Sequence, residues 1–261
     1  MRYDHYVEND SGAYSILPSW VVPKVIDDER ENDARFVKKH QALLQSLVGD
    51  DAFVARVVVG EPLTEAEREE WISRVRWPLN VKCGKLLISG GFDPDTIADL
   101  AEEESSFIEV PPGEYVVEVL TYLNTMNGRV HRGEWGPDGL LGAWFRRDWP
   151  GRKFPTWVAS ELFWAPEEDP GHEAEWNDFE GSVRAGKLQV ESGPMSWVGV
   201  VVHLIPGSGK TASDLSRPEE DGFFAADAGL RRLERFPLGI PSDNDEPMVS
   251  SEVRNVIAPE A

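Results

Sequence analysis

The chain has 261 residues, and its 47 acidic residues against 26 basic ones give a formal net charge of -21 at pH 7. Nucleic acid binding requires a basic surface that faces the phosphates, so this charge argues against a nucleic acid ligand and favours a basic partner protein. Apolar residues make up 41% of the chain, and this content excludes global disorder. A salt-adapted acidic surface is an alternative explanation of the charge that needs no partner.

Helical periodicity marks the N-terminal part of the chain. Apolar residues recur at steps of three and four from Asp27 to Val48, which predicts a first helix. The apolar run 53–59 that follows is typical of a short strand.

The clearest local pattern is LTEAEREEWISRV, which contains a helix start. Thr64 can cap the helix, and Glu67 three residues later completes a capping box. The pattern predicts a second helix from Glu65 to about Val75. Together with the first helix, it predicts a helical N-terminal region, residues 1–78, that packs on a sheet.

Strand patterns dominate after this region. The runs 81–89 and 115–123 are rich in strand-forming residues, and Pro112-Gly113 before the second run suits a type II turn. The acidic connection between the two runs is expected to contain a helical turn at 96–103. Further strands are predicted at 140–145, 156–164, 188–190 and 197–204.

The order of these elements predicts the fold class. Regular turn patterns without alternating strands and helices indicate an α+β fold, mainly an antiparallel β-sandwich with two N-terminal helices. The sandwich is expected to span 79–240. A polar, frayed tail is expected at 241–261.

The stretch 84–123 carries a local resemblance. It contains GKLLISGG and then Val110-Pro111-Pro112-Gly113-Glu114-Tyr115 at a predicted hairpin. This combination resembles small bacterial β-sandwich proteins of the nuclease-inhibitor and toxin-immunity type. The resemblance implies an inhibitor that binds a toxin or nuclease, but it assigns no functional residues.

The composition also bears on the compartment. The first residues lack the basic and apolar segments of a signal peptide, and the longest apolar run, 197–205, is too short to span a membrane. The single cysteine, Cys83, excludes an intrachain disulfide. We therefore expect a cytoplasmic protein that contacts no membrane.

Motifs for catalysis or cofactor binding are incomplete throughout. PGSGKT at 206–211 resembles part of a phosphate-binding loop, but Leu204 occupies the position of its first glycine. HEAEW at 172–176 lacks the second histidine of the zinc-protease motif. We therefore predict no catalytic residue, no cofactor and no metal.

Two groups of residues are candidates for partner binding. The first is a set of acidic residues in charged clusters, namely Glu102, Glu103, Glu104, Glu167, Glu168 and Asp169. The second is a basic aromatic stretch within 143–164, represented by Trp149, Arg146, Arg147 and Arg152. Tryptophan and arginine dominate interface hot spots, but tryptophans in the core with arginines at the rim would give the same pattern.

The sequence therefore favours a non-enzymatic bacterial binding protein. Its most concrete form is an acidic, immunity-type inhibitor of a basic toxin or nuclease. The alternative from another class is a carbohydrate-active or other hydrolytic enzyme with paired carboxylates in a tryptophan-lined cleft. A structural domain that forms homo-oligomers is a third interpretation.

Overall fold

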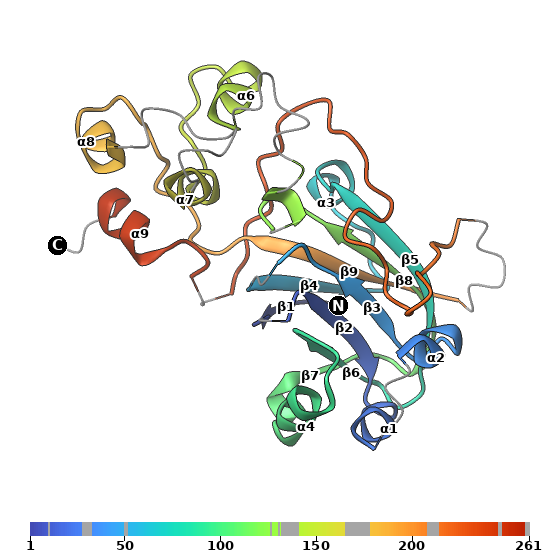
Figure 1. Ribbon diagram of the computed structural model, residues 1–261. Coiled ribbons are helices and arrows are strands. Elements are labelled where there is room, and N and C mark those ends of the chain that lie inside the picture. The colour runs from blue at the N-terminus through green and yellow to red at the C-terminus, as the bar shows by residue number, and fades with distance from the viewer. Residues whose placement is uncertain are drawn as a thin grey trace.

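Two β-sheets form the centre of the molecule (Figure 1). The computed structural model describes residues 1–9, 11–27, 33–49, 52–125, 127–129, 131, 141–164, 178–207, 214–244 and 247–258. The larger sheet consists, in spatial order, of β1 (Arg2–Val7), β4 (Phe53–Val59), β9 (Val198–Pro206), β8 (Gly113–Thr121) and β5 (Ser73–Val81). The smaller sheet consists of β3 (Leu43–Ser46), β2 (Ala13–Pro18), β6 (Lys85–Ser89) and β7 (Phe107–Glu109).

Neighbouring strands run antiparallel in both sheets, with one exception. β4 and β9 pair in parallel, with Val57 opposite Val202. β9 pairs on its other side with β8, where Glu118 lies opposite His203. The architecture is α+β, as the sequence predicts.

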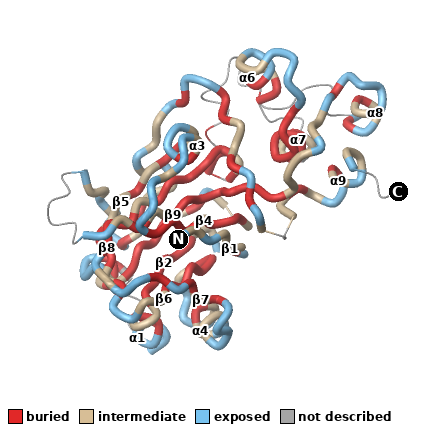
Figure 2. The backbone as a smooth tube through the Cα atoms, turned by 180° about the vertical axis from the view of Figure 1, so that it is seen from behind, coloured by how far each residue is buried: buried red, intermediate tan, exposed pale blue. Residues whose placement is uncertain are grey.

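The two sheets share one buried core, so they pack face to face as a sandwich. Tyr14 of β2 meets Phe53 of β4 edge to face across the layers, with ring centroids 5.2 Å apart. Along β8, Tyr115, Val117 and Val119 point into this core, as the two-residue period of a strand requires. Figure 2 shows the buried residues concentrated along the strands.

Helices surround the sandwich and also form a second core beside it. Near the sheets lie α1 (Val22–Ile26), α2 (Asp33–Lys38), α3 (Glu65–Glu69), α4 (Pro94–Glu102) and the 3-10 turn η1 (Glu104–Ser106). Apart from them lie α6 (Leu141–Asp148), α7 (Thr156–Trp164), α8 (Phe179–Arg184) and α9 (Ser251–Ile257) (Figure 1). These four helices bury Trp144, Trp157, Phe179 and Val253 in one cluster with Phe236.

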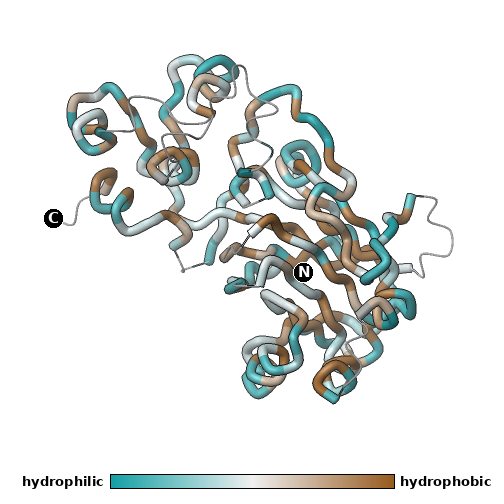
Figure 3. The backbone as a smooth tube through the Cα atoms, in the orientation of Figure 1, coloured by the Kyte–Doolittle hydropathy of each residue, from teal (hydrophilic) through white to brown (hydrophobic). Residues whose placement is uncertain are grey.

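Figure 3 shows apolar residues along the strands and polar residues alternating with them on the helices. No helix in the described ranges is long and apolar enough to cross a membrane.

The predicted helix at 27–48 is wrong over most of its length. The structure has α2 up to Lys38 and then strand β3 from Leu43. His40 ends the helical path because it adopts a left-handed backbone with φ 57°. The apolar pattern of β3 resembles a helix because Leu43, Leu44 and Gln45 are all buried, so both faces of the strand are covered.

The second predicted helix is correct at its start and too long at its end. Thr64 accepts the backbone N–H of Glu67, whose side chain accepts the N–H of Thr64, so the capping box is present. α3 nevertheless ends at Glu69, and β5 begins at Ser73, because residues 73–81 pair with β8. The prediction of a helical region over 1–78 is therefore corrected, since β1 to β4 and the first part of β5 lie within it.

Two predicted strands are helices. Of the predicted strand at 140–145, the described residues 141–145 belong to α6, and 156–164 is α7. Val158, Ala159 and Leu162 of α7 are all buried. A helix that is apolar on most sides lacks the polar face that would reveal its period. The run 188–190 makes only an isolated bridge, between Phe154 and Val190.

The remaining predicted elements are close to those observed. The runs 53–59, 115–123 and 197–204 correspond to β4, β8 and β9, and the helical turn at 96–103 is part of α4. The run 81–89 is divided between the end of β5 and β6. The described parts of the predicted frayed tail are 241–244 and 247–258, and the second of them instead contains α9 and buries Val249 and Val253.

Candidate binding groove

A groove of about 720 Å³ lies between α3 and the segment 231–237. Its lining residues are Glu65, Ala66, Glu69, Glu70, Trp149, Arg231, Arg232, Leu233, Glu234, Arg235, Phe236 and Pro237. We call this the charged groove, because one wall carries carboxylates and the other carries guanidinium groups.

The acidic wall follows from the geometry of α3. Glu65 and Glu69 are four residues apart, so they lie on the same face of the helix, and both are exposed. Glu67 lies on another face and is fully buried, where it forms an ion pair with Arg2. Its backbone carbonyl accepts a hydrogen bond from the Tyr122 hydroxyl at 2.7 Å. The contacts of Glu67 thus hold α3 in place through its buried face, while Glu65 and Glu69 line the groove.

The basic wall is attached to the end of α3 by Arg231. Its Nε donates to the carbonyl of Trp71 at 2.7 Å, and its Nη2 donates to the carbonyl of Glu69. The guanidinium also lies 3.8 Å from the centre of the Trp71 ring. Carbonyls at the end of a helix lack partners within the helix, and a cation there is favourable. Burial lowers the pKa of Arg231 from its ordinary value.

Trp149 anchors the other end of the same segment. Its Nε1 donates to the carbonyl of Phe236 at 2.9 Å, and Asp148 accepts the N–H of Phe236 at 2.6 Å. The Arg235 guanidinium lies 3.4 Å from the centre of the Trp149 ring, and that of Arg152 lies 5.4 Å from it. Stacking on the indole holds the exposed Arg235 in place at the groove.

Glu70 is a half-buried residue of the charged groove. Burial raises the pKa of this carboxyl, although its Oε2 accepts the backbone N–H of Gly239 at 2.8 Å. Among the described residues, no group of three or more histidine, cysteine, aspartate or glutamate side chains is placed to hold a metal ion.

The structure places the predicted basic aromatic residues in two settings. Trp149 lines the charged groove and Arg152 stacks on it. Arg146 instead lies over Phe154, at 5.2 Å, and Arg147 forms an ion pair with Asp148 at 2.6 Å. The alternative interpretation also holds in part, because Trp144 and Trp157 are core residues.

Those predicted acidic residues that the structure describes lie outside the charged groove. Glu102 ends α4, which lies at the end of the molecule away from α6 (Figure 1). The exposed Glu103 and Glu104 directly follow α4 in the chain. Glu104 forms an ion pair with Lys85 at 3.2 Å. The other predicted acids, Glu167, Glu168 and Asp169, lie outside the described residues, as do His172 and most of the loop 206–211.

Sequence reasoning missed most of the charged groove. The run RRLERF at 231–236 combines three arginines with an aromatic residue, the same composition that singles out 143–164. It is the feature from which the basic wall could have been found. Nothing in the sequence indicates that this run faces Glu65 and Glu69.

No family model and no curated protein matches the chain. Among solved structures, the chain is similar to "Crocagin biosynthetic gene J", with a TM-score of 0.42 and 12% identity over 79% of this chain and 97% of that one. It is also similar to ComJ from Bacillus subtilis, an inhibitor of the DNA degrading activity of NucA, with a TM-score of 0.31 and 11% identity over 46% of this chain and 81% of that one. At these TM-scores neither likeness carries an argument about the function of this chain.

Proposed function

We propose that this chain is a non-enzymatic binding protein that holds a segment of a basic partner protein in the charged groove, and that it acts as an immunity-type inhibitor of a toxin or nuclease. The observation that carries the proposal is the pair of oppositely charged walls around an aromatic anchor. Glu65 and Glu69 offer acceptors for basic side chains of the partner. Arg235 on Trp149 offers donors for its backbone carbonyls and carboxylates, and such residues dominate binding energy at interfaces.

The charge of the chain supports a basic partner. A net charge of -21 attracts a basic protein over a distance and raises the association rate more than the affinity. Exposed acids outside the groove contribute to this field, including Glu102, Glu103 and the run 219–221. Salt screens the field beyond about 8 Å at physiological ionic strength, so association is expected to slow as salt rises.

The test screens the chain against basic toxins and nucleases, including any encoded beside its gene, and measures their activity as the chain is added. Two variants make the same change in charge at different places: Glu65→Gln with Glu69→Gln in the groove, and Glu102→Gln with Glu103→Gln at α4. We expect the wild type to inhibit, the groove variant to bind roughly tenfold or more weakly, and the α4 variant to change mainly the association rate. Absence of inhibition, or equal effects of the two variants on dissociation, would contradict the proposal.

One observation favours a second candidate, a hydrolytic enzyme. Glu70 combines a raised pKa with a position in the groove that Trp149 also lines, and both are properties expected of a general acid in glycoside hydrolysis. Glu65 or Glu69 would then supply the second carboxylate. Hydrolysis of a panel of aryl glycosides by the wild type, lost in Glu70→Gln and kept in Glu102→Gln, would support this candidate and contradict a purely binding role.

A further inference from the structure

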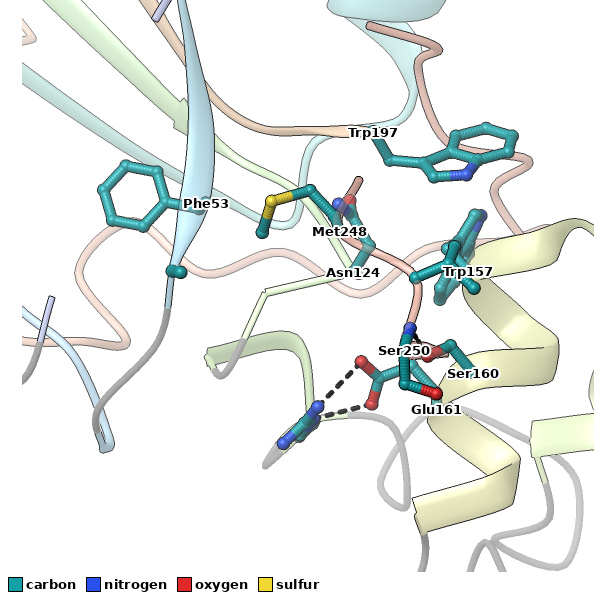
Figure 4. Close-up of a pocket in the computed structure, with 11 residues that line it drawn as sticks. Phe53, Asn124, Trp157, Ser160, Glu161, Trp197, Met248 and Ser250 are labelled. Carbon is teal, nitrogen blue, oxygen red and sulfur yellow. Dashed lines mark hydrogen bonds and ion pairs between the residues drawn. The ribbon is translucent and has the colours of Figure 1, made fainter. Parts of the chain in front are cut away.

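A second cavity lies where the core of the sandwich meets the core formed by the helices. It is open to solvent on one side and has a volume of about 250 Å³. Phe53 of β4 lies on one side of it, and Trp157 of α7 and Trp197 lie on the other (Figure 4). It shares no lining residue with the charged groove, so its ligand is a separate question from the proposed function.

The two tryptophans form a fixed aromatic wall. Trp157 Nε1 donates to the carbonyl of Leu238 at 2.9 Å, and Trp197 Nε1 donates to Thr156 Oγ1 at 2.8 Å. Gly239 packs against both rings, because a Cβ at this position would lie 2.8 Å from Trp157 Nε1 and 3.0 Å from Trp197 Cε3. With the indole N–H groups engaged inside the protein, the tryptophans can offer a ligand only their ring surfaces.

Three polar side chains in the wall keep unused hydrogen-bonding capacity. The Oδ1 atom of Asn124 is buried and has no partner among the described residues. Ser160 Oγ accepts the N–H of Ser250 at 3.4 Å, and Ser250 Oγ accepts that of Val253 at 3.3 Å. Within the described part of the chain, neither hydroxyl donates a hydrogen bond. A buried acceptor without a donor is unfavourable, so an occupant with an N–H or O–H group would be favoured here.

The charged residues of the wall neutralise each other. Arg129 binds Glu161 through two hydrogen bonds, Nε to Oε2 at 2.6 Å and Nη2 to Oε1 at 3.0 Å (Figure 4). Because the charges of Arg129 and Glu161 are opposite and directly paired, together they add no net charge to the cavity. Among the described lining residues no other side chain is charged, so a charged ligand would find no counter-charge on them.

We infer that this cavity binds a small uncharged molecule with a planar ring and an amide-like edge. The ring would pack on the tryptophan surfaces, an N–H of the edge would donate to Asn124 Oδ1, and the carbonyl of the edge would accept from the Ser160 or Ser250 hydroxyl. The volume lies just below the range of about 300–1,000 Å³ for sites of drug-sized ligands, so a single-ring molecule is the appropriate size.

Calorimetric titration of the full chain with nicotinamide, benzamide and uracil tests the inference, with benzoate and benzylamine as charged counterparts. We expect at least one uncharged amide to bind and to quench tryptophan fluorescence, and both charged molecules to bind more weakly. Asn124→Ala should weaken binding roughly tenfold. Asn80→Ala, which removes a half-buried asparagine side chain on β5 outside the cavity, should leave it unchanged.

Three outcomes would overturn the inference: no uncharged amide binds, Asn124→Ala binds as the wild type does, or a charged counterpart binds more tightly. If Asn124→Ala fails to fold, Ser160→Ala provides the same test, since it removes a second polar group of the wall. The groove variant Glu65→Gln with Glu69→Gln should bind the amide normally, which separates this result from the outcome for the proposed function.

Discussion

Arg56 on β4 holds Asp4 on β1 with two hydrogen bonds, from Nε to Oδ1 at 2.6 Å and from Nη2 to Oδ2 at 2.7 Å. The two residues are directly opposite each other in the register of the strands. Asp4 also accepts the Ser242 hydroxyl at 2.7 Å, and Arg56 donates to the carbonyl of Pro241 at 2.9 Å. The pair therefore connects the edge of the larger sheet to the segment that leads to α9.

Removing Arg56 should strongly destabilise the fold. Arg56→Met leaves the carboxylates of Asp4 and the fully buried Glu67 short of a counter-charge, which costs about 3–5 kcal/mol for a buried pair. The free energy of unfolding in urea measures this loss. Arg68→Met is the control, because Arg68 is exposed on α3, and it should change stability by less than about 0.5 kcal/mol. Equal effects of the two substitutions would contradict the prediction.

The same pair should make stability depend on acidic pH. Burial by itself raises the pKa of Asp4, but hydrogen bonds from Arg56 and Ser242 outweigh it and hold the pKa below the ordinary value of 3.8. A lowered pKa in the folded state contributes stability above pH 3.8, and this contribution is lost as the pH falls through the folded value. Asp4→Asn should therefore be less stable than the wild type at neutral pH, and the difference should shrink below pH 3.8. A difference that stays constant with pH would show that the ion pair is not its cause.

Alanine substitutions at Gly239 and Gly151 distinguish the cost of a left-handed backbone from the cost of steric crowding. Both have a left-handed φ, +82° and +78°, but a Cβ would meet two indole rings at Gly239 and nothing within 4 Å at Gly151. Gly151→Ala should cost about 1–2 kcal/mol, as expected for a left-handed backbone. Gly239→Ala should cost a further 1–3 kcal/mol or so, because Trp157 and Trp197 must move. Thermal unfolding measures the stabilities, and a shift in tryptophan emission in Gly239→Ala alone would confirm the movement.

The N-cap of α3 at Thr64 should contribute measurably to the free energy of unfolding. Thr64→Ala removes the acceptor for the Glu67 N–H and should reduce the free energy of unfolding by about 1 kcal/mol. Thr64→Ser keeps the hydroxyl and should stay close to the wild type. Chemical denaturation of both variants tests the prediction, which fails if the serine variant loses as much stability as the alanine variant.

The exposed thiol of Cys83 should ionise more readily than a free cysteine. Partial burial raises its pKa, but hydrogen bonds with Ser19 Oγ, at 2.9 Å, and with backbone groups outweigh this and bring it below 9.0. Alkylation by iodoacetamide across a pH series should therefore have its midpoint below 9.0, and Ser19→Ala should raise the midpoint. An unchanged midpoint in Ser19→Ala would show that Ser19 does not stabilise the thiolate.

Features encoded within a few residues could be predicted from the sequence. The capping box of Thr64 and Glu67 needs only four consecutive residues, and β8 contains enough β-branched and aromatic residues to identify it as a strand. The left-handed conformation of His40 is different, because distant contacts accompany it. The carbonyl of His40 accepts the N–H of Asn80, and the imidazole ring of His40 lies 5.4 Å from the ring of Trp77. Asn80 and Trp77 are both residues of β5.

The charged groove could not be predicted for a similar reason. Glu65 and Arg235 are far apart in the sequence, and Arg231 brings their segments together through carbonyls of α3. Local patterns identified Trp149 as a residue of interest but gave no means to pair it with Arg235. The α7 residues were misassigned because a helix buried on most sides has the composition of a buried strand.

The central position of β9 has a consequence for how the chain folds. Without β9 the larger sheet divides into two separate pairs, β1 with β4 and β5 with β8. During synthesis, both pairs emerge from the ribosome long before Val198, so the inner edges of β4 and β8 stay open until most of the chain has been made. The parallel contact between Val57 and Val202 also spans a long loop, whose closure slows folding. Chains that stop before β9 should therefore expose two apolar strand edges and aggregate rather than form a smaller stable domain.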